Sequence, residues 1–163
     1  MQEDTRAKET LDMKAWDDNP DAKIVPVTMT FVPYPDLALS LGILVKEHVA
    51  KQREDAWKLY NTLKTKKKGW DQLKICRMWE GYLPCLAWYY NVAHANCNRR
   101  MVPVGSHKPI DTSAMIINFP SWFGNQKLHQ SHRSNLVALY DEYETLWFGA
   151  ARTPKNLPFY WPL

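Results

Sequence analysis

Apolar residues recur at helical spacing in three stretches of this chain, and the pattern predicts an all-α protein with three main helices and long loops. The first stretch runs from residue 36 to about 66. The second runs from about 71 to 99, with a kink expected at Gly81 and Pro84. The third follows Asn125, whose side chain is of a type that caps a helix.

The third stretch holds more hydrogen-bonding groups than a helix needs to fold. Residues 128–136 read Leu-His-Gln-Ser-His-Arg-Ser-Asn-Leu. On a helix of 3.6 residues per turn, His132 falls inside the apolar stripe, and we expect it to hold helices together. His129 and Arg133 lie along one border, where we expect them to face an anionic ligand, and Asn135 lies along the other.

A second polar cluster interrupts the apolar stripe of the first helix. His48 and Gln52 lie within the stripe, Asp55 lies at its border, and Glu54 points away from it. Two such clusters suggest that the two helices meet through them. Two interpretations stay open, a buried hydrogen-bond network without chemistry and a functional site.

Composition and charge indicate a compact single domain, residues 29–163, preceded by an acidic arm, residues 1–28. The chain has 163 residues, 45% of them hydrophobic and 13% aromatic. The arm carries seven acidic and four basic side chains, which gives it a net charge of −3. The whole chain has 17 acidic and 21 basic side chains, so residues 29–163 carry ten acidic and seventeen basic side chains and a net charge of +7. A basic body with interleaved aromatic residues is typical of a nucleic-acid-binding protein.

Other features exclude several classes of protein. No apolar run is long enough to cross a bilayer and the N-terminus is not a signal peptide, so we expect a cytoplasmic protein without a membrane partner. Three cysteines without a CxxC spacing indicate buried thiols rather than a zinc site. We expect neither a metal nor a cofactor. The lysine run at 64–68 is typical of a solvated helix end, and in a basic body it can also contact phosphates.

Five fragments stand out together: Thr-Phe-Val-Pro-Tyr at 30–34, Lys-Gln-Arg at 51–53, Arg-Met-Trp-Glu-Gly-Tyr at 77–82, Pro-Ser-Trp-Phe-Gly at 120–124 with the 128–136 segment, and Leu-Pro-Phe-Tyr-Trp-Pro at 157–162. In this order they resemble small phage and bacterial proteins of the pyrimidine-dimer DNA glycosylase family, of the endonuclease V type. The resemblance implies a helical domain that binds double-stranded DNA. It also implies that an N-terminal α-amine attacks C1′ of a damaged nucleotide, forming a Schiff base that leads to strand cleavage by β-elimination.

Transferred by position, the resemblance assigns roles to individual residues of this chain. The nucleophile is the amine of Thr30, and the assisting carboxylate is Asp55, with Glu54 as the neighbouring alternative. An α-amine is partly neutral near pH 7 and therefore nucleophilic without special tuning. The expected DNA contacts are Lys51, Arg53, His129, Arg133 and Asn135, and the expected structural polar core is His48, Gln52 and His132.

The 28 residues before Met29 make the Thr30 nitrogen an amide, which does not form a Schiff base. Lyase chemistry therefore requires removal of the arm or a start at Met29; otherwise this member keeps only the fold. The alternative function is that of a non-enzymatic viral or phage structural protein, in the host cytoplasm or the virion, whose arm binds a partner subunit. A third hypothesis is that the arm folds onto the basic surface as an inhibitor.

Overall fold

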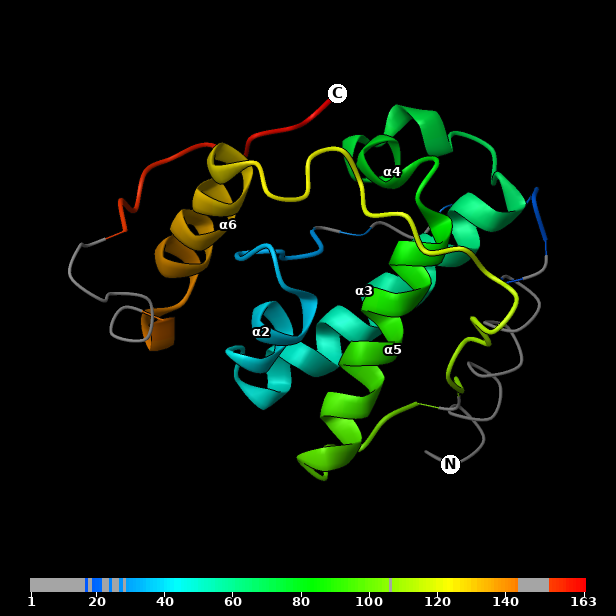
Figure 1. The fold of residues 1–163 in the computed structure, drawn as a ribbon, viewed down its shortest axis with the longest axis horizontal. Helices are drawn as coiled ribbons and strands as arrows, with labels where there is room; N and C mark the ends of the chain where they lie inside the picture. Colours follow the sequence, from blue (N-terminus) through cyan, green and yellow to red (C-terminus); the bar gives the residue numbers. More distant parts are fainter. Residues whose placement is uncertain are drawn as a thin grey trace, which may run out of the picture.

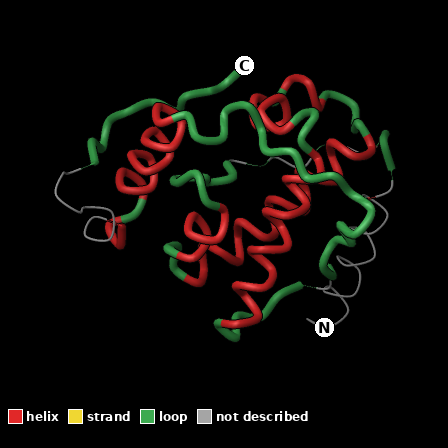
Figure 2. Tube along the Cα trace, in the orientation of Figure 1, coloured by secondary structure: helices red, strands yellow, loops and turns green. Residues whose placement is uncertain are grey.

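The regular elements of the computed structural model are helices, and no strand occurs among the residues that it describes (Figures 1 and 2). These residues are 29–105, 107–143 and 153–163, together with 17, 19–21, 24 and 27. The all-α prediction is therefore confirmed for this part of the chain. The elements are α2 (Leu37–Gly42), α3 (Lys46–Thr65), η1 (Trp70–Gln72), α4 (Lys74–Trp79), α5 (Leu83–Arg99), α6 (Gln126–Leu139) and η2 (Asp141–Tyr143), where η denotes a 3-10 turn.

The stretch predicted as one helix from 36 to 66 is two helices, α2 and α3. Asp36 begins α2 as expected, since its carboxylate accepts a hydrogen bond from the Leu39 amide at 2.9 Å. The chain then turns after Gly42, and the guanidinium of Arg100 donates to the carbonyls of Gly42 and Leu44. A side chain from the end of α5 thus binds carbonyls that a continuous helix would have used internally.

The stretch predicted as one kinked helix from 71 to 99 is also divided. Gly81 has a φ of 84°, a left-handed conformation that favours glycine, and it separates α4 from α5. Pro84 lies in the first turn of α5, where its missing N–H has no intrahelical partner to lose. The residues expected to bend a helix are instead those that end one helix and start the next.

Helices α3 and α5 pack against each other and form the centre of the molecule (Figure 1). The extended segment 29–34 lies between this pair and α6, which contacts the centre chiefly through that segment. The core contains Trp79 and Tyr89, both with 0% exposure, and the free thiols of Cys76, Cys85 and Cys97 are buried. No helix in the described part of the chain is both long and apolar enough to span a bilayer.

Helix α6 begins where the sequence predicts, because the Asn125 side chain accepts a hydrogen bond from the Lys127 amide at 3.0 Å. Its polar residues also hold the C-terminal segment. Ser134 accepts from the Leu157 amide at 3.0 Å, and Ser131 accepts from the Tyr160 amide at 3.1 Å. Helix α6 ends at Leu139, so Tyr140 and Tyr143, which continue its apolar spacing in the sequence, lie at its C-cap and in η2. The arm's sequence also allows a short helix near residues 5–16, which lies outside the described residues.

Candidate functional site

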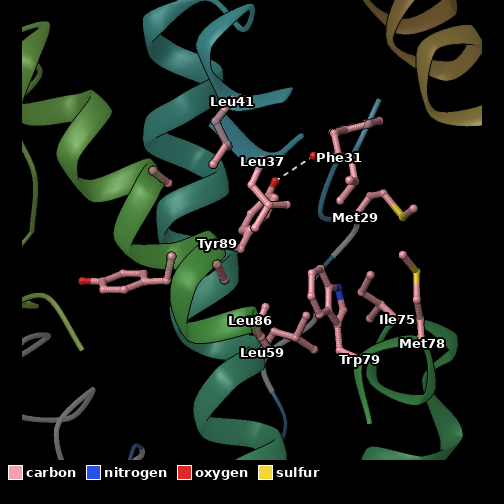
Figure 3. Packing of buried hydrophobic residues seen from close by; sticks show 14 of the residues in the cluster. Met29, Phe31, Leu37, Leu41, Leu59, Ile75, Met78, Trp79, Leu86 and Tyr89 are labelled. Atoms are coloured by element: carbon pink, nitrogen blue, oxygen red, sulfur yellow. Dashed lines mark hydrogen bonds between the residues drawn. The ribbon is translucent and has the colours of Figure 1, made fainter. Parts of the chain in front are cut away.

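Side chains from three helices fix the extended segment 29–34. Gln52 of α3 donates to the Met29 carbonyl at 3.2 Å and accepts from the Phe31 amide at 2.8 Å. The hydroxyl of Tyr89, from α5, lies 3.0 Å from the Phe31 carbonyl (Figure 3). It also lies 2.7 Å from the Gln52 side-chain oxygen. These contacts bind the backbone as a neighbouring strand would, so the position of residues 29–31 is strongly determined.

The two histidines of α6 complete this arrangement by binding both polar groups of Val32. His129 Nδ1 donates to the Val32 carbonyl at 2.7 Å, while its Nε2 accepts from the Gly124 amide at 2.8 Å. His132 Nδ1 accepts from the Val32 amide at 2.9 Å. Burial and, to a lesser extent, the nearby His129 lower the pKa of His132 to about 3, so His132 is neutral and serves as an acceptor.

A pocket of about 200 Å³ opens beside Met29 and Phe31. This volume is below the roughly 300 Å³ at which small-molecule sites begin, so it suits a group of sugar size. Because side chains alternate along an extended segment, Thr30 points the opposite way, and its hydroxyl accepts from the Trp79 indole at 2.8 Å. The remaining lining residues are Leu44, His48, Lys51, Gln52, Asp55, Leu136, Leu139, Tyr140 and Phe159.

Asp55 supplies a buried carboxylate to this pocket. Its side chain is 3% exposed, and it accepts an ion-pair hydrogen bond at 3.1 Å from Lys51, one helical turn earlier, whose side chain is 59% exposed. Burial raises the pKa of Asp55, and the Lys51 ammonium opposes this effect without cancelling it. A carboxylate with a raised pKa and a neighbouring cation is suited to general acid–base chemistry.

His48 forms another part of the wall. Its Nδ1 hydrogen-bonds the Tyr143 hydroxyl, and its ring lies against the Tyr140 ring with 4.0 Å between the centroids and an angle of 38° between the planes. Burial lowers the pKa of His48, while the carboxylates of Glu142 and Glu47 act in the opposite direction. The two tyrosines come from α6's C-terminal end and η2, so this wall joins the start of α3 to a distant part of the chain.

Arg53 and Glu54, which adjoin Asp55 in sequence, face a different side of α3. Arg53 is 1% exposed, and its nitrogens donate to His94 Nδ1 at 2.9 Å, to Glu54 at 3.0 Å and to the His107 carbonyl. The expected phosphate contact of Arg53 is therefore not supported, because its guanidinium is buried and bound by protein. Glu54 does not line the pocket, which leaves Asp55 as the carboxylate of the two that does.

His129, which we expected to face a ligand, lies against segment 29–34 and not at an open surface. Its side chain is fully buried, because segment 29–34 covers the border of α6 that the helical projection left open. Arg133 is half-buried and donates to the Pro33 carbonyl at 2.7 Å. Asn135 donates to the Ser131 and Leu157 carbonyls. These three side chains hold extended segments, and none of them lines the pocket.

Several residues of the site could not be identified from the sequence pattern. Tyr89 and Trp79 contact segment 29–34 through single polar atoms, but both occupy apolar positions of helices and look like ordinary core residues. Phe159 reaches the pocket from the C-terminal segment, for which only the resemblance offered a signal. Among the described residues, no group of three or more His, Cys, Asp or Glu side chains is arranged to hold a metal ion.

Comparison with known proteins finds a similar family for the segment that supplies most of the residues lining this pocket. The family model described as pyrimidine dimer DNA glycosylase matches residues 29–108. This part of the chain is therefore similar to the pyrimidine dimer DNA glycosylase family. The match confirms the resemblance and begins at Met29, so it includes α3 with Asp55 and leaves out the arm. Searches of curated proteins and of solved structures gave no significant match.

Proposed function

We propose that this protein is a DNA-repair glycosylase with abasic-site lyase activity when its chain begins at Thr30. The observation that carries the proposal is the pocket beside Met29, which has the buried Asp55 carboxylate in its wall. In a chain that begins at Thr30, the methionine side chain is missing from the pocket. The α-amine of Thr30 then takes the position next to the vacated space.

The contacts of the neighbouring residues support this position for the amine. The Trp79 indole holds the Thr30 hydroxyl, and Gln52 and Tyr89 hold the following residue, Phe31. These contacts do not involve the peptide bond between Met29 and Thr30. Only a further hydrogen bond, from the Gln52 side chain to the Met29 carbonyl, depends on that bond. Loss of Met29 therefore frees one donor of Gln52 at the pocket and leaves the anchors of Thr30 and Phe31 in place.

The proposed reaction uses the amine and the carboxylate together. The neutral amine bonds to C1′ of the damaged nucleotide as the bond from C1′ to the base breaks, and the base leaves with that electron pair and takes up a proton. The C1′–O4′ bond then breaks, O4′ takes up the proton that the amine nitrogen releases, and the opened sugar carries a protonated imine at C1′. Asp55 then accepts the proton from C2′, and the C3′–oxygen bond breaks with release of the phosphate. Hydrolysis of the imine returns the amine. A raised pKa suits Asp55 to this exchange of protons.

The experiment compares residues 30–163, prepared with Thr30 at the N-terminus, with the full-length chain on duplex DNA that contains one pyrimidine dimer. We expect borohydride to trap only the shorter chain, with the adduct on the Thr30 amine. Asp55→Asn in the shorter chain keeps DNA binding and reduces strand cleavage by about 10²–10⁴, the usual contribution of a general acid–base group.

Two outcomes would contradict the proposal. Equal trapping of both chains on dimer DNA would exclude Thr30 as the nucleophile. Weak DNA binding that does not depend on salt concentration would favour the structural-protein alternative, since contacts with phosphates release counterions and make affinity fall steeply with salt.

A further inference from the structure

The full-length chain has a different amine at the same pocket. There the Thr30 nitrogen is an amide and the Thr30 residue is 0% exposed. Among the residues that line the pocket, Lys51 alone carries an amine. Its side chain is 59% exposed, so the amine is accessible to a ligand that enters from solvent.

The position of this amine is set by the same carboxylate. Lys51 and Asp55 are one turn apart on α3, and the distance from Nζ to the nearer carboxylate oxygen is 3.1 Å. Asp55 is held by its burial, whereas the lysine stem is flexible, so the carboxylate holds the amine at the mouth of the pocket. An amine next to a potential proton acceptor is the pair of groups that imine chemistry requires.

We propose that, in the full-length chain, Lys51 is a second imine-forming nucleophile that cleaves DNA at sites that have already lost their base. The inference rests on the proposed binding of DNA at this pocket. An abasic sugar opens to an aldehyde at C1′, so no base has to be displaced. This substrate suits the Lys51 amine, which is exposed at the mouth of the pocket. An amine at Thr30, in contrast, would be held against an intact nucleotide.

The steps balance without any further reactant. The neutral Lys51 amine adds to the aldehyde carbon, water leaves, and a protonated imine forms. The iminium group acidifies the C2′ proton, which Asp55 accepts, and the C3′–oxygen bond breaks so that the phosphate leaves with the electron pair. Water then hydrolyses the imine and regenerates Lys51.

The test uses the full-length protein, with its intact N-terminus verified by mass, on duplex DNA with one abasic site. We expect borohydride to trap an adduct that peptide mapping assigns to Lys51. Lys51→Arg keeps the positive charge and the pairing with Asp55 but forms no such imine, so we expect loss of the trapped adduct. The matched control is Lys46→Arg, an exposed residue in the first turn of α3 outside the pocket, and we expect no change.

Absence of trapping, an adduct at another residue, or undiminished trapping with Lys51→Arg would each overturn the inference. Its failure is distinguishable from failure of the proposed function because the two use different chains and substrates. Trapping of residues 30–163 on dimer DNA, without trapping of the full-length chain on abasic DNA, rejects only the role of Lys51. The reverse pattern rejects only the role of Thr30.

Discussion

At the scale of single residues, Val32 explains why one helix carries two histidines three positions apart. His129 donates to its carbonyl and His132 accepts from its amide, so the two imidazoles bind both polar groups of one peptide residue. Opposite tautomers are required, with the proton on Nδ1 of His129 and on Nε2 of His132. The backbone amide and carbonyl of Val32 are thereby hydrogen-bonded inside the protein, although its extended segment has no strand partner.

The neutral state of His132 predicts how the stability of the protein depends on pH. An unfolded histidine titrates near 6.5, while His132 in the folded protein has a pKa of about 3. The contribution of neutral His132 to the free energy of unfolding is therefore complete above pH 6.5 and is lost as the pH falls toward 3. The loss is about 1.4 kcal/mol per pH unit in this window, because only the unfolded chain binds the proton.

The variant His132→Leu isolates this effect. At pH 7 we expect it to lower the free energy of unfolding by about 1–3 kcal/mol, because the Val32 amide loses its acceptor. Between pH 7 and pH 5 the difference between wild type and variant should narrow by about 2 kcal/mol, measured by urea unfolding at each pH. The other histidines are common to both proteins and cancel. A difference that stays constant over this range would contradict a neutral, buried His132.

At the scale of elements, the helix ends depend on conformations that a periodic pattern does not encode. Gly81 and Pro84 are visible signals in the sequence, but they fit both a kink and a boundary between helices. The turn between α2 and α3 follows Gly42, but this glycine does not have a positive φ, and Arg100 from the end of α5 binds the carbonyls of the turn. Helix type and approximate extent were predictable from spacing, whereas these boundaries depend on backbone conformation and tertiary contacts.

Two glycines provide a matched test of this interpretation. A Cβ atom added at either Gly42 or Gly81 meets no atom within 4 Å, so steric clash affects neither substitution. Gly42 lies in α2 with ordinary φ, and Gly42→Ala should raise the free energy of unfolding by about 0.5–1 kcal/mol. Gly81 has a φ of 84°, and Gly81→Ala should lower the free energy of unfolding by about 1–2 kcal/mol.

Thermal or urea unfolding of the two variants at one pH measures these opposite changes. Equal effects of the same sign would show that packing, and not backbone conformation, decides both positions.

The candidate site was predictable to the extent that it lies on one helix face. His48, Gln52 and Asp55 recur at helical spacing, and they line one pocket. The helical projection of α6 was less informative. It predicts on which face of the helix a residue lies, but not which other segment covers that face. Segment 29–34 covers His129, and α5 with the loop at His107 covers Arg53, so both became structural residues.

At the scale of the whole molecule, the described part of the arm is bound to the body. Lys67 lies in the lysine run expected to be solvated, yet it is 0% exposed and its ammonium donates to the carbonyls of Asp17 and Asn19. The Trp57 indole donates to the Asp17 carboxylate at 3.1 Å, and the Lys68 amide donates to the Pro20 carbonyl. These contacts lie toward the C-terminal end of α3, whereas the pocket uses its N-terminal half.

This arrangement predicts energetic coupling between the arm and Lys67. In the full-length chain, Lys67→Met should lower the free energy of unfolding by about 1–3 kcal/mol, because the carbonyls of Asp17 and Asn19 lose their donor and the first of these bonds is buried. In residues 30–163 these carbonyls are absent and water reaches the ammonium. The same substitution should therefore lower the free energy of unfolding much less. The difference is the coupling energy of a double-mutant cycle, measured by urea unfolding of the four proteins.

Lys68→Met is the matched control, since the Lys68 side chain is exposed and only its backbone contacts the arm. It should change stability little in either chain. An equal cost of Lys67→Met in both chains would mean that the arm does not depend on this lysine. A large coupling energy would instead mean that an arm cut before Thr30 stays bound through Asp17 and Asn19, because the contacts of Lys67 and Trp57 with these residues do not require a continuous chain. The amine of Thr30 would then be free while the arm still covers the end of α3.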